Sequence, residues 1–347
     1  MPAKGLVLIS GVNGYIASRT AETFLKAGYS IRGTVRSLES GKALLNVLSE
    51  YATIGQLEIV TVPDITVDEA FDEAVKGVTA ICHMASPVSF SFTDPDYVIN
   101  TAVGGTVSIL KSALKAGEQL KSVIYISSIA AIVGPQEAPY TFTEKDWNSF
   151  SEGEVARLGG GAGGPQIYLA SKTAAERAFW KFRDEHKPKF SQTAVNPVFV
   201  TGPPLLLAET PGENGKNINE TVRDIYQILA FGKIVPAMLP SPSFVDNRDV
   251  ARIMLFAVEE AKKCNGERFI ACGGRFAEQA IADILRKQYP DRDIEEGSPG
   301  EGYLPDFSYP KDGIAVSGKK IVEFSGVGYL PYRQSVIEAA KAFEIYL

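Results

Sequence analysis

The chain has 347 residues, of which 45% are hydrophobic and 22% are charged, and its formal net charge is -6. These proportions are ordinary for a globular protein with a substantial core. The net negative charge argues against a nucleic-acid-binding surface, because neutralising phosphates needs clustered Lys and Arg, and the basic residues here are scattered among acids.

The cysteine and histidine content argues against a disulfide framework or a metal site. The three cysteines, Cys82, Cys264 and Cys272, are widely spaced and match no paired metal pattern. Two histidines, His83 and His186, leave little material for a catalytic zinc or a Ser-His-Asp triad. No apolar run approaches the ~20 residues of a transmembrane helix, and a strand begins too early for a signal peptide. We therefore expect a cytoplasmic protein that binds neither a membrane nor a metal.

The first half of the chain alternates between strand-like and helix-like segments. Short apolar runs predict strands, and apolar residues at helical spacing predict the helices between them. The expected strands are residues 6–9, 31–35, 57–60, 80–84, 122–126 and 193–195, and the expected helices include residues 16–27, 44–48 and 96–113. Such alternation implies right-handed crossovers and a parallel sheet covered on both faces. We predict a doubly wound α/β fold, or Rossmann fold, which binds ligands at the carboxyl ends of its strands.

Beyond about Pro197 the pattern becomes irregular and prolines are frequent. Apolar residues persist, so we interpret this part as a smaller, C-terminal substrate-binding lobe rather than a linker. The expected dinucleotide-binding domain covers residues 1–200, to which residues 243–262 return. The lobe is expected to consist mainly of residues 201–347.

A glycine-rich turn, GVNGYI at residues 11–16, follows the first strand. Its glycines permit a tight turn and let the backbone approach a pyrophosphate, which then lies on the N-terminus of the next helix. The position after the first strand, rather than the spacing alone, favours a dinucleotide site over a purely structural turn. The expected cofactor contacts here are Gly11, Asn13, Gly14, Tyr15 and Ile16.

The end of the second strand indicates which dinucleotide binds. An NAD enzyme usually has Asp or Glu there, accepting hydrogen bonds from the ribose hydroxyls. This chain has Arg36 and Ser37 instead. The guanidinium of Arg36 can pair with a 2′-phosphate, and Ser37 can add a hydroxyl. A solvated surface arginine is the alternative, but the missing carboxylate favours NADPH.

Two further strand ends carry candidate cofactor contacts. After the third strand come Asp64 and Ile65, and the Asp64 carboxylate could accept from an adenine amino group. A turn-forming aspartate explains Asp64 nearly as well. Ala85 and Ser86 follow the fourth strand, where small residues would let a cofactor lie close to the sheet. The neighbouring His83 is interpreted as a packed structural residue.

The strongest chemical signal is Tyr168 followed by Lys172. Residues four apart share one face of a helix, and a nearby cation favours phenolate over a phenol whose pKa is ordinarily about 10. The fifth strand ends in Ser127 and Ser128, where a hydroxyl can hydrogen-bond a substrate carbonyl. Adjacent strand residues point to opposite faces, so only one serine can serve, and the residues themselves leave the choice open.

Taken together, these motifs resemble an extended short-chain dehydrogenase/reductase of the dihydroflavonol-reductase-like branch. The similarity is greatest to microbial NADPH-dependent carbonyl, aldehyde and methylglyoxal reductases, and it covers nearly the whole chain. The motifs that carry it are GVNGYIA at 11–17, RGTVRS at 32–37, PDI at 63–65, HMASPVSF at 83–90, ISS at 126–128, YLASK at 168–172, AVNPVFVTGP at 194–203 and VDNRDVA at 245–251.

The resemblance implies NADPH-dependent reduction of a small-molecule ketone or aldehyde, with Tyr168 donating the proton. In that family the second serine of the pair is catalytic, which favours Ser128, and the arginine after the second strand binds the 2′-phosphate. The implied catalytic residues are Ser128, Tyr168 and Lys172. Further implied cofactor contacts are Pro197 and Val200. The implied substrate wall consists of Val88, Ile129, Val133 and Phe199, closed by residues 205–240.

Two alternatives remain open. A sugar-nucleotide epimerase or dehydratase would share the fold and the Tyr/Lys pair, but the apolar segments 203–207 and 234–242 suit a nucleotide diphosphate poorly. A non-catalytic NADPH-sensing protein need not retain that pair. The glycine-rich run at residues 159–164 is either a mobile lid or a slack surface loop, and the protein is expected to be a monomer or homodimer.

Overall fold

The computed structural model describes residues 3–235, 243–307 and 313–347. Three predictions fall partly elsewhere. The start of the chain, which argues against a signal peptide, includes residues 1–2, the closing segment 205–240 includes residues 236–240, and the apolar segment 234–242 includes residues 236–242. Those positions lie outside the described residues. Within the described ranges, no helix combines the length and apolar character needed to cross a membrane.

The chain divides into two compact units. The first unit comprises Met1–Pro135, Thr143–Asn196 and Ala251–Ile270, and the second comprises Gln136–Phe142, Pro197–Val250 and Ala271–Leu347.

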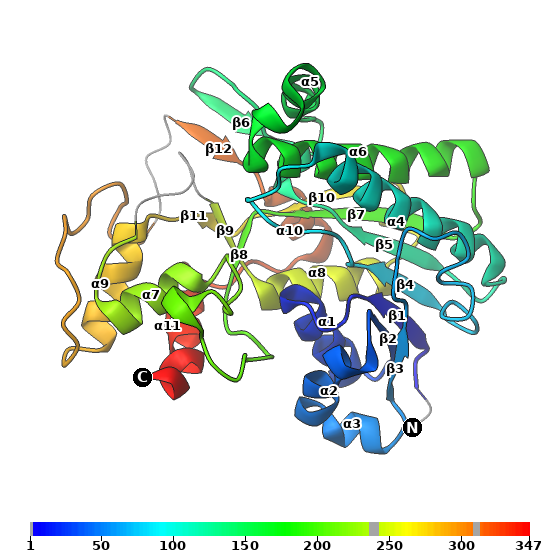
Figure 1. Cartoon of the computed structure of the whole chain (residues 1–347), viewed down its shortest axis with the longest axis horizontal. Coiled ribbons are helices and arrows are strands. Elements are labelled where there is room, and N and C mark those ends of the chain that lie inside the picture. The colour runs from blue at the N-terminus through cyan, green and yellow to red at the C-terminus, as the bar shows by residue number, and fades with distance from the viewer. Residues whose placement is uncertain (1–2, 236–242, 308–312) are drawn as a thin grey trace. The chain divides into compact units, whose positions relative to one another are not determined.

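A seven-stranded sheet forms the centre of the first unit (Figure 1). In spatial order its strands are β10 (Arg268–Ala271), β7 (Ser191–Pro197), β5 (Ser122–Ile126), β4 (Ala80–His83), β1 (Leu6–Ser10), β2 (Ser30–Val35) and β3 (Leu57–Thr61). Each pairing from β3 through β7 is parallel. The strand order reverses at β1, with β2 on one side and β4 on the other, so the prediction of a doubly wound Rossmann fold is confirmed.

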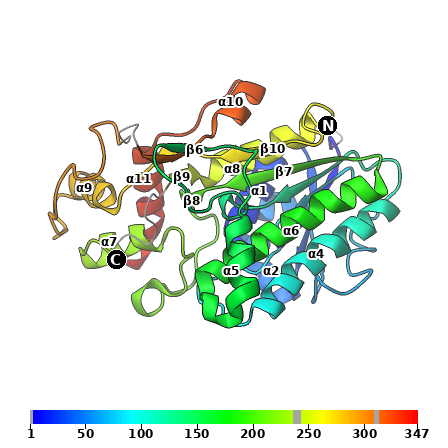
Figure 2. The ribbon, with the colours of Figure 1, turned by 90° about the horizontal axis from the view of Figure 1, so that it is seen from above.

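Helices cover both faces of this sheet. They are α1 (Tyr15–Lys26), α2 (Leu38–Val47), α3 (Ser49–Thr53), α4 (Pro95–Lys115), α5 (Ser149–Leu158), α6 (Gly164–His186) and α8 (Asn247–Glu259), with the 3-10 turns η1 (Ile129–Ala131) and η2 (Gly159–Ala162). Figures 1 and 2 show α4 and α6 on one face and α1 on the other.

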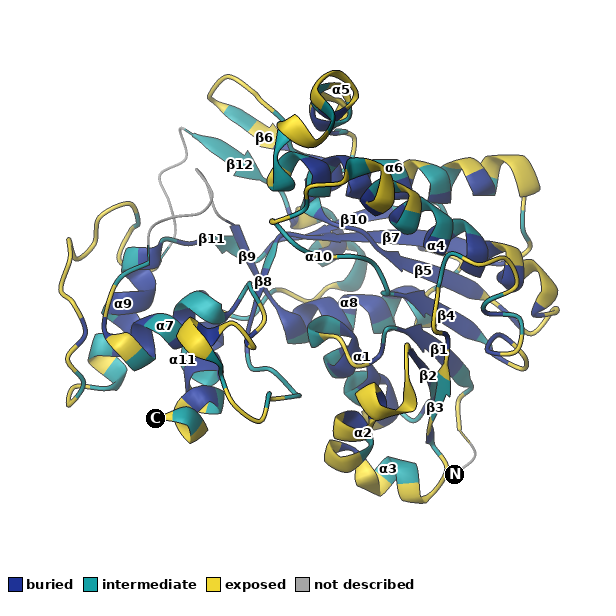
Figure 3. Cartoon of the chain, in the orientation of Figure 1, coloured by how far each residue is buried: buried dark blue, intermediate teal, exposed yellow. Residues whose placement is uncertain are grey.

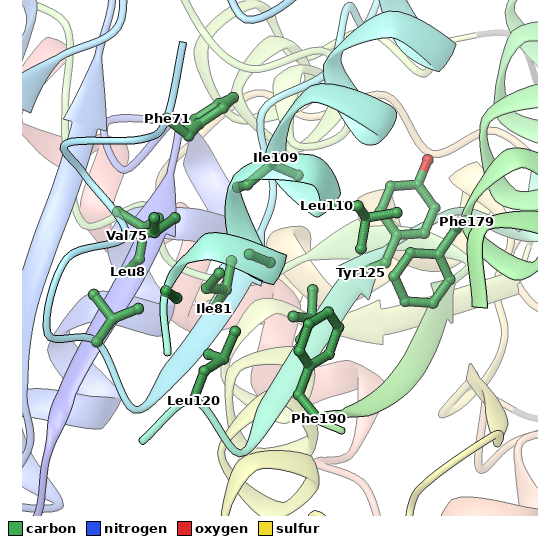
Figure 4. Packing of buried hydrophobic residues seen from close by; sticks show 14 of the residues in the cluster. Leu8, Phe71, Val75, Ile81, Ile109, Leu110, Leu120, Tyr125, Phe179 and Phe190 are labelled. Carbon is green, nitrogen blue, oxygen red and sulfur yellow. The ribbon is translucent and has the colours of Figure 1, made fainter. Parts of the chain in front are cut away.

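The core beneath α4 and α6 follows from the alternation of side chains along the strands. Leu8, Ile81 and Tyr125 project from β1, β4 and β5 onto the same face, where Ile109 of α4 and Phe179 of α6 meet them (Figure 4). The strands are buried along most of their length, whereas the outer helices carry exposed residues (Figure 3). The predicted helix at 96–113 is confirmed as part of α4, and its buried side includes Val98, Ala102, Thr106, Ile109, Leu110 and Ala113.

Small sheets and helices make up the second unit. A three-stranded sheet has the order β11 (Gly274–Arg275), β9 (Ser243–Asp246), β8 (Phe199–Thr201), and β12 (Ile314–Val316) pairs with β6 (Tyr140–Phe142). The helices are α7 (Arg223–Phe231), α9 (Glu278–Gln288), α10 (Lys319–Ser325) and α11 (Tyr332–Phe343), with short turns η3 (Glu213–Gly215) and η4 (Glu344–Tyr346). Aromatic rings pack these elements together: Tyr332 lies 4.7 Å from Phe244 and 5.6 Å from Phe276, measured between ring centroids.

Candidate active site

Tyr168 and Lys172 lie one turn apart on α6, and Lys172 Nζ is 5.8 Å from the centroid of the Tyr168 ring. The helix begins at Gly164, and Pro165 suits its first turn. Backbone N–H groups there have no partner within the helix, so the missing N–H of proline costs no hydrogen bond. Only 3% of Lys172 is exposed. Burial lowers the pKa of its amine to about 8, because a low-dielectric environment disfavours the charged form. The ammonium form still predominates at neutral pH.

The Tyr168 ring also meets Phe90 edge to face, with ring centroids 5.3 Å apart. Gly164 makes this approach possible, because a Cβ there would lie 2.1 Å from the Phe90 carbonyl oxygen and 2.9 Å from the Phe92 nitrogen. Gly160 is similarly close to the chain, since its Cβ would lie 2.7 Å from the Thr93 carbonyl oxygen.

The glycine-rich run at 159–164 joins α5 to α6. Gly159–Ala162 forms a 3-10 turn, and Gly164 is already the first residue of α6. Gly160 and Gly164 let this segment pack against the backbone that follows β4. Close packing explains these two glycines, whereas Gly159 and Gly163 have positive φ values and a Cβ there would meet no described atom within 4 Å. A closing movement of this run over a substrate stays a prediction.

The two serines after β5 make different hydrogen bonds. Ser127 Oγ donates to the buried Glu176 carboxylate over 2.5 Å. Ser128 Oγ instead accepts from the Ala130 N–H over 3.1 Å and caps η1. A hydroxyl that accepts from the backbone keeps its own hydrogen for another acceptor, such as a carbonyl oxygen. Ser128 is thus the better placed of the two to donate to a ligand.

The glycine-rich turn brings its backbone close to the chain that follows β4. Gly11 has a φ of +64°, and a Cβ there would lie 3.1 Å from Ala85 Cα. Gly14 forms the N-cap of α1, whose first turn holds no acidic residue. Asn13 is exposed beside it, whereas Tyr15 and Ile16 are half-buried in the first turn of the helix. The uncompensated end of α1 suits an anion.

Arg36 and Ser37 are exposed at the end of β2, where Ser37 is the N-cap of α2. Within the described parts of the chain, the Arg36 guanidinium forms no ion pair. Asp64 accepts hydrogen bonds from the backbone N–H and the hydroxyl of Thr66, over 2.8 and 2.7 Å. These bonds lower the pKa of the Asp64 carboxyl and produce the turn that the sequence left as an alternative. Ile65 is half-buried behind this turn.

A buried hydroxyl joins the ends of β1 and β4. Ser10 Oγ accepts from the Met84 and Ala85 N–H groups over 2.8 and 3.0 Å, and lies 2.8 Å from His83 Nδ1. Both lone pairs of the hydroxyl are used, so its hydrogen points at Nδ1 and His83 carries its own proton on Nε2. Burial and the Lys172 charge lower the pKa of His83 to about 3. His83 is therefore a neutral packed residue, as expected.

The remaining predicted residues fall in both units. In the first unit, Ser86 Oγ is buried and finds no hydrogen-bond partner among the described residues. Of the proposed substrate wall, Val88 is exposed, while Ile129 and Val133 are half-buried after β4 and β5. The second unit holds Pro197, Val200 and Phe199, whose ring centroid lies 5.6 Å from that of Phe276.

Phe90 belongs to the apolar segment 88–92, which the sequence favours as part of the substrate pocket, but its contact with Tyr168 was not predicted. Two further residues around this site were not predicted from the sequence. Ser10 ends the first strand with a hydroxyl like that of the fifth. Glu176 continues the spacing of four from Tyr168 and Lys172, a signal that was available in the sequence. Its partners are distant in the chain, so the spacing alone could not show what it binds.

Residues 7–272 match the NAD dependent epimerase/dehydratase family. An aldehyde reductase of Sporidiobolus salmonicolor is 31% identical over 309 residues, which cover 87% of this chain and 86% of that protein. A ketoreductase of Aspergillus niger is 34% identical over 293 residues, 82% of each chain.

Comparison with solved structures also shows similarity to a reductase. The crystal structure of a yeast methylglyoxal/isovaleraldehyde reductase complexed with NADPH matches with a TM-score of 0.83 and 28% identity. The match covers 99% of this chain and 100% of that one. The resemblance to extended short-chain dehydrogenases/reductases is thereby confirmed, and the chain belongs to the NAD dependent epimerase/dehydratase family.

Proposed function

We propose that the chain is an NADPH-dependent carbonyl reductase that converts ketones and aldehydes to alcohols. The observation that carries this proposal is the pairing on α6 of the Tyr168 phenol with the buried ammonium of Lys172, 5.8 Å from its ring centroid. The relatives named as aldehyde reductase and ketoreductase support reduction. They favour it over the epimerase or dehydratase chemistry that the family description names.

The residues of the first unit fit NADPH. The N-terminus of α1, with Gly14 as its N-cap and no acidic residue in its first turn, suits a pyrophosphate. Among the described residues, the exposed guanidinium of Arg36 has no ion-pair partner and suits a 2′-phosphate. The buried Ser86 hydroxyl likewise finds no partner among them, and a cofactor would provide one. Bound NADPH would supply the hydride.

The chain's own side chains would control the carbonyl oxygen. Ser128 and Tyr168 would donate hydrogen bonds to it, stabilising the negative charge that develops as the carbonyl is reduced. Tyr168 would then transfer its phenolic proton to that oxygen. The ammonium of Lys172 would favour the phenolate that remains, because an opposite charge nearby stabilises the ionised form.

The substrate that we propose is a small, neutral and partly hydrophobic carbonyl compound. In the first unit, Val88, Ile129 and Val133 would supply apolar contacts, and apolar walls with a few hydroxyls suit such a molecule. The first unit would hold NADPH, and the second would contribute to substrate binding. A cytoplasmic location and a monomeric or homodimeric state remain predictions.

The test measures NADPH oxidation by the purified protein with aldehydes and ketones in turn, and conversion of sugar nucleotides by mass spectrometry and chromatography, because epimerisation and dehydration consume no NADPH. Tyr168→Phe should reduce carbonyl turnover by about 10²–10⁴, because it removes the proposed proton donor. NADPH affinity, measured by fluorescence titration, should change by less than about twofold. Tyr97→Phe, which alters an exposed tyrosine of α4, is the matched control and should retain full activity. Near-normal turnover by Tyr168→Phe would refute this mechanism, and turnover of sugar nucleotides alone would support the epimerase or dehydratase alternative.

A further inference from the structure

Glu176 is a completely buried carboxylate on the face of α6 that carries Tyr168 and Lys172. Its exposed fraction is 0%, and it follows Lys172 by one helical turn. A buried charge is costly unless hydrogen bonds replace the lost water. The neighbours of Glu176 should therefore be donors, and the structure shows that they are.

Four donors surround the Glu176 carboxylate. Ser127 Oγ and Asn196 Nδ2 donate to Oε2 over 2.5 and 2.6 Å. Arg268 Nε and Trp180 Nε1 donate to Oε1 over 2.6 and 3.2 Å. An ionised carboxylate accepts about four hydrogen bonds, two at each oxygen, and has no hydrogen to donate. The surroundings of Glu176 therefore match the ionised form.

The Oε2 side of this carboxylate leads directly to Ser128. Asn196 Nδ2 donates to the Ser128 carbonyl oxygen over 3.0 Å as well as to Glu176. Both of these partners are acceptors, which fixes the orientation of the Asn196 amide. One carboxylate thus holds Ser127 through its hydroxyl and Ser128 through the intervening amide.

The Oε1 side anchors the carboxylate to β10. Arg268 Nη1 donates to the backbone carbonyl oxygens of Glu144 and Asp146, each over 2.8 Å. The Arg268 guanidinium also lies over the Trp147 ring, with Cζ 3.9 Å from the centroid. Glu176 thereby ties α6, the end of β5, the end of β7 and the start of β10 to one point.

We infer that Glu176 is a positioning residue: its ionised carboxylate fixes Ser128 relative to Tyr168 and Lys172. This inference rests on the proposed function, in which the Ser128 hydroxyl and the Tyr168 phenol act on the same carbonyl oxygen. Rate depends steeply on such alignment, since a displacement of about 1 Å can cost a factor of 10². Glu176 touches neither reactant and acts through its hydrogen bonds alone.

Glu176→Gln tests this role with little change in volume. The amide places an NH₂ group where one oxygen stood, so it faces groups that are themselves donors. The Ser127 hydroxyl can reverse and accept, but Asn196 must give up either Glu176 or the Ser128 carbonyl. We expect kcat to fall by about 10- to 100-fold. The KM for the carbonyl substrate and the Kd for NADPH should stay within about twofold of the wild-type values.

Trp180→Phe is the matched control, because it removes one donor from Oε1 and leaves the Oε2 side intact. It should lower the thermal midpoint while kcat stays within about twofold. If Glu176→Gln does not fold, Ser127→Ala is the second variant. It removes one hydrogen-bond donor to Oε2 and places no new donor against an existing one. It should lower kcat by about 2- to 10-fold, the factor expected for one hydrogen bond. A folded Glu176→Gln protein with wild-type kcat would overturn the inference, as would parallel losses of kcat and NADPH affinity.

Amide hydrogen exchange separates this inference from the proposed function. A wild-type protein that reduces no carbonyl compound would refute the function but not the positioning role. Exchange in the segment 127–133 should still be faster in Glu176→Gln than in Trp180→Phe, because only the first variant releases Ser127 and Ser128. Equal exchange in the two variants would overturn the positioning role, whatever the activity.

Discussion

At the scale of single residues, burial acts on two basic side chains with different outcomes. It lowers the pKa of Lys172 from 10.5 to about 8 and that of His83 from 6.5 to about 3. The amine of Lys172 begins so high that it stays mostly protonated at neutral pH, whereas His83 is left uncharged. The cation that faces Tyr168 is therefore Lys172, and His83 serves as a neutral packed ring beside the predicted cofactor turn.

We predict that Arg36 determines the preference for NADPH over NADH. Its guanidinium is exposed and unpaired in the described parts of the chain, so a 2′-phosphate would be its first strong partner. Arg36→Ala should reduce kcat/KM for NADPH by about 10- to 100-fold, the effect of one lost charged hydrogen bond, with little change for NADH. Lys42→Ala, which removes an exposed cation already paired with Glu39, should leave the ratio of the two values unchanged. Equal losses with both cofactors in Arg36→Ala would refute the assignment.

At the scale of elements, α6 and the ends of the parallel strands combine to form the site. The helix carries three functional side chains at a spacing of four residues, those of Tyr168, Lys172 and Glu176. Parallel strands end at one edge of the sheet, so Ser128 after β5 and Asn196 in β7 lie close enough to share a hydrogen bond. The helix was recognisable from local spacing. Its partners depend on the order of the strands in space.

The close packing at the start of α6 leads to a prediction for Gly164. Gly164→Ala would place a Cβ against the backbone of Phe90 and Phe92, which cannot move aside as a flexible side chain can. We expect the free energy of unfolding to fall by about 1–3 kcal/mol, as for other overpacked positions. Because Phe90 contacts Tyr168, kcat should fall as well.

Gly153→Ala provides the control, since its Cβ would meet no described atom within 4 Å and it lies inside α5. That change should raise the free energy of unfolding by up to about 1 kcal/mol, through helix propensity. Urea titration of both variants gives the comparison. A Gly164→Ala protein as stable as Gly153→Ala would contradict the prediction. It would show that the segment after β4 moves aside to accommodate the added methyl group.

At the scale of the whole molecule, elements with a local signal in the sequence could be predicted. Elements that depend on pairing between distant segments could not. The strands β1, β4 and β5 are largely apolar runs at regular intervals between helical segments, so the Rossmann fold and its glycine turn could be predicted from local pattern. The strand β6 pairs with β12, whose residues lie far along the chain, and neither strand has a strong local signal. β10 is only four residues long and was missed for the same reason. The choice between Ser127 and Ser128 likewise needed Glu176, which no local pattern connects to β5.

The stability of the molecule should depend on the protonation of His83. Its pKa is 6.5 in the unfolded chain and about 3 in the folded one. Between these values the unfolded state binds the extra proton, so the contribution of His83 to stability is complete above about pH 6.5 and is lost progressively as the pH falls. One such group changes the free energy of unfolding by up to about 1.4 kcal/mol per pH unit.

The measurement is urea unfolding of wild type and His83→Asn at several pH values from neutral to about pH 4. Asparagine can still accept the Ser10 hydrogen but does not titrate, so its curve should lack the histidine contribution. Loss of the ring stacked on Tyr125 will lower stability at every pH, which makes the slope rather than the absolute value the decisive quantity. Carboxylates contribute equally to both proteins and cancel in the comparison. Identical slopes would mean that His83 binds a proton as readily in the folded as in the unfolded state, and the inferred donation from the Ser10 hydroxyl to a neutral His83 Nδ1 would then be wrong.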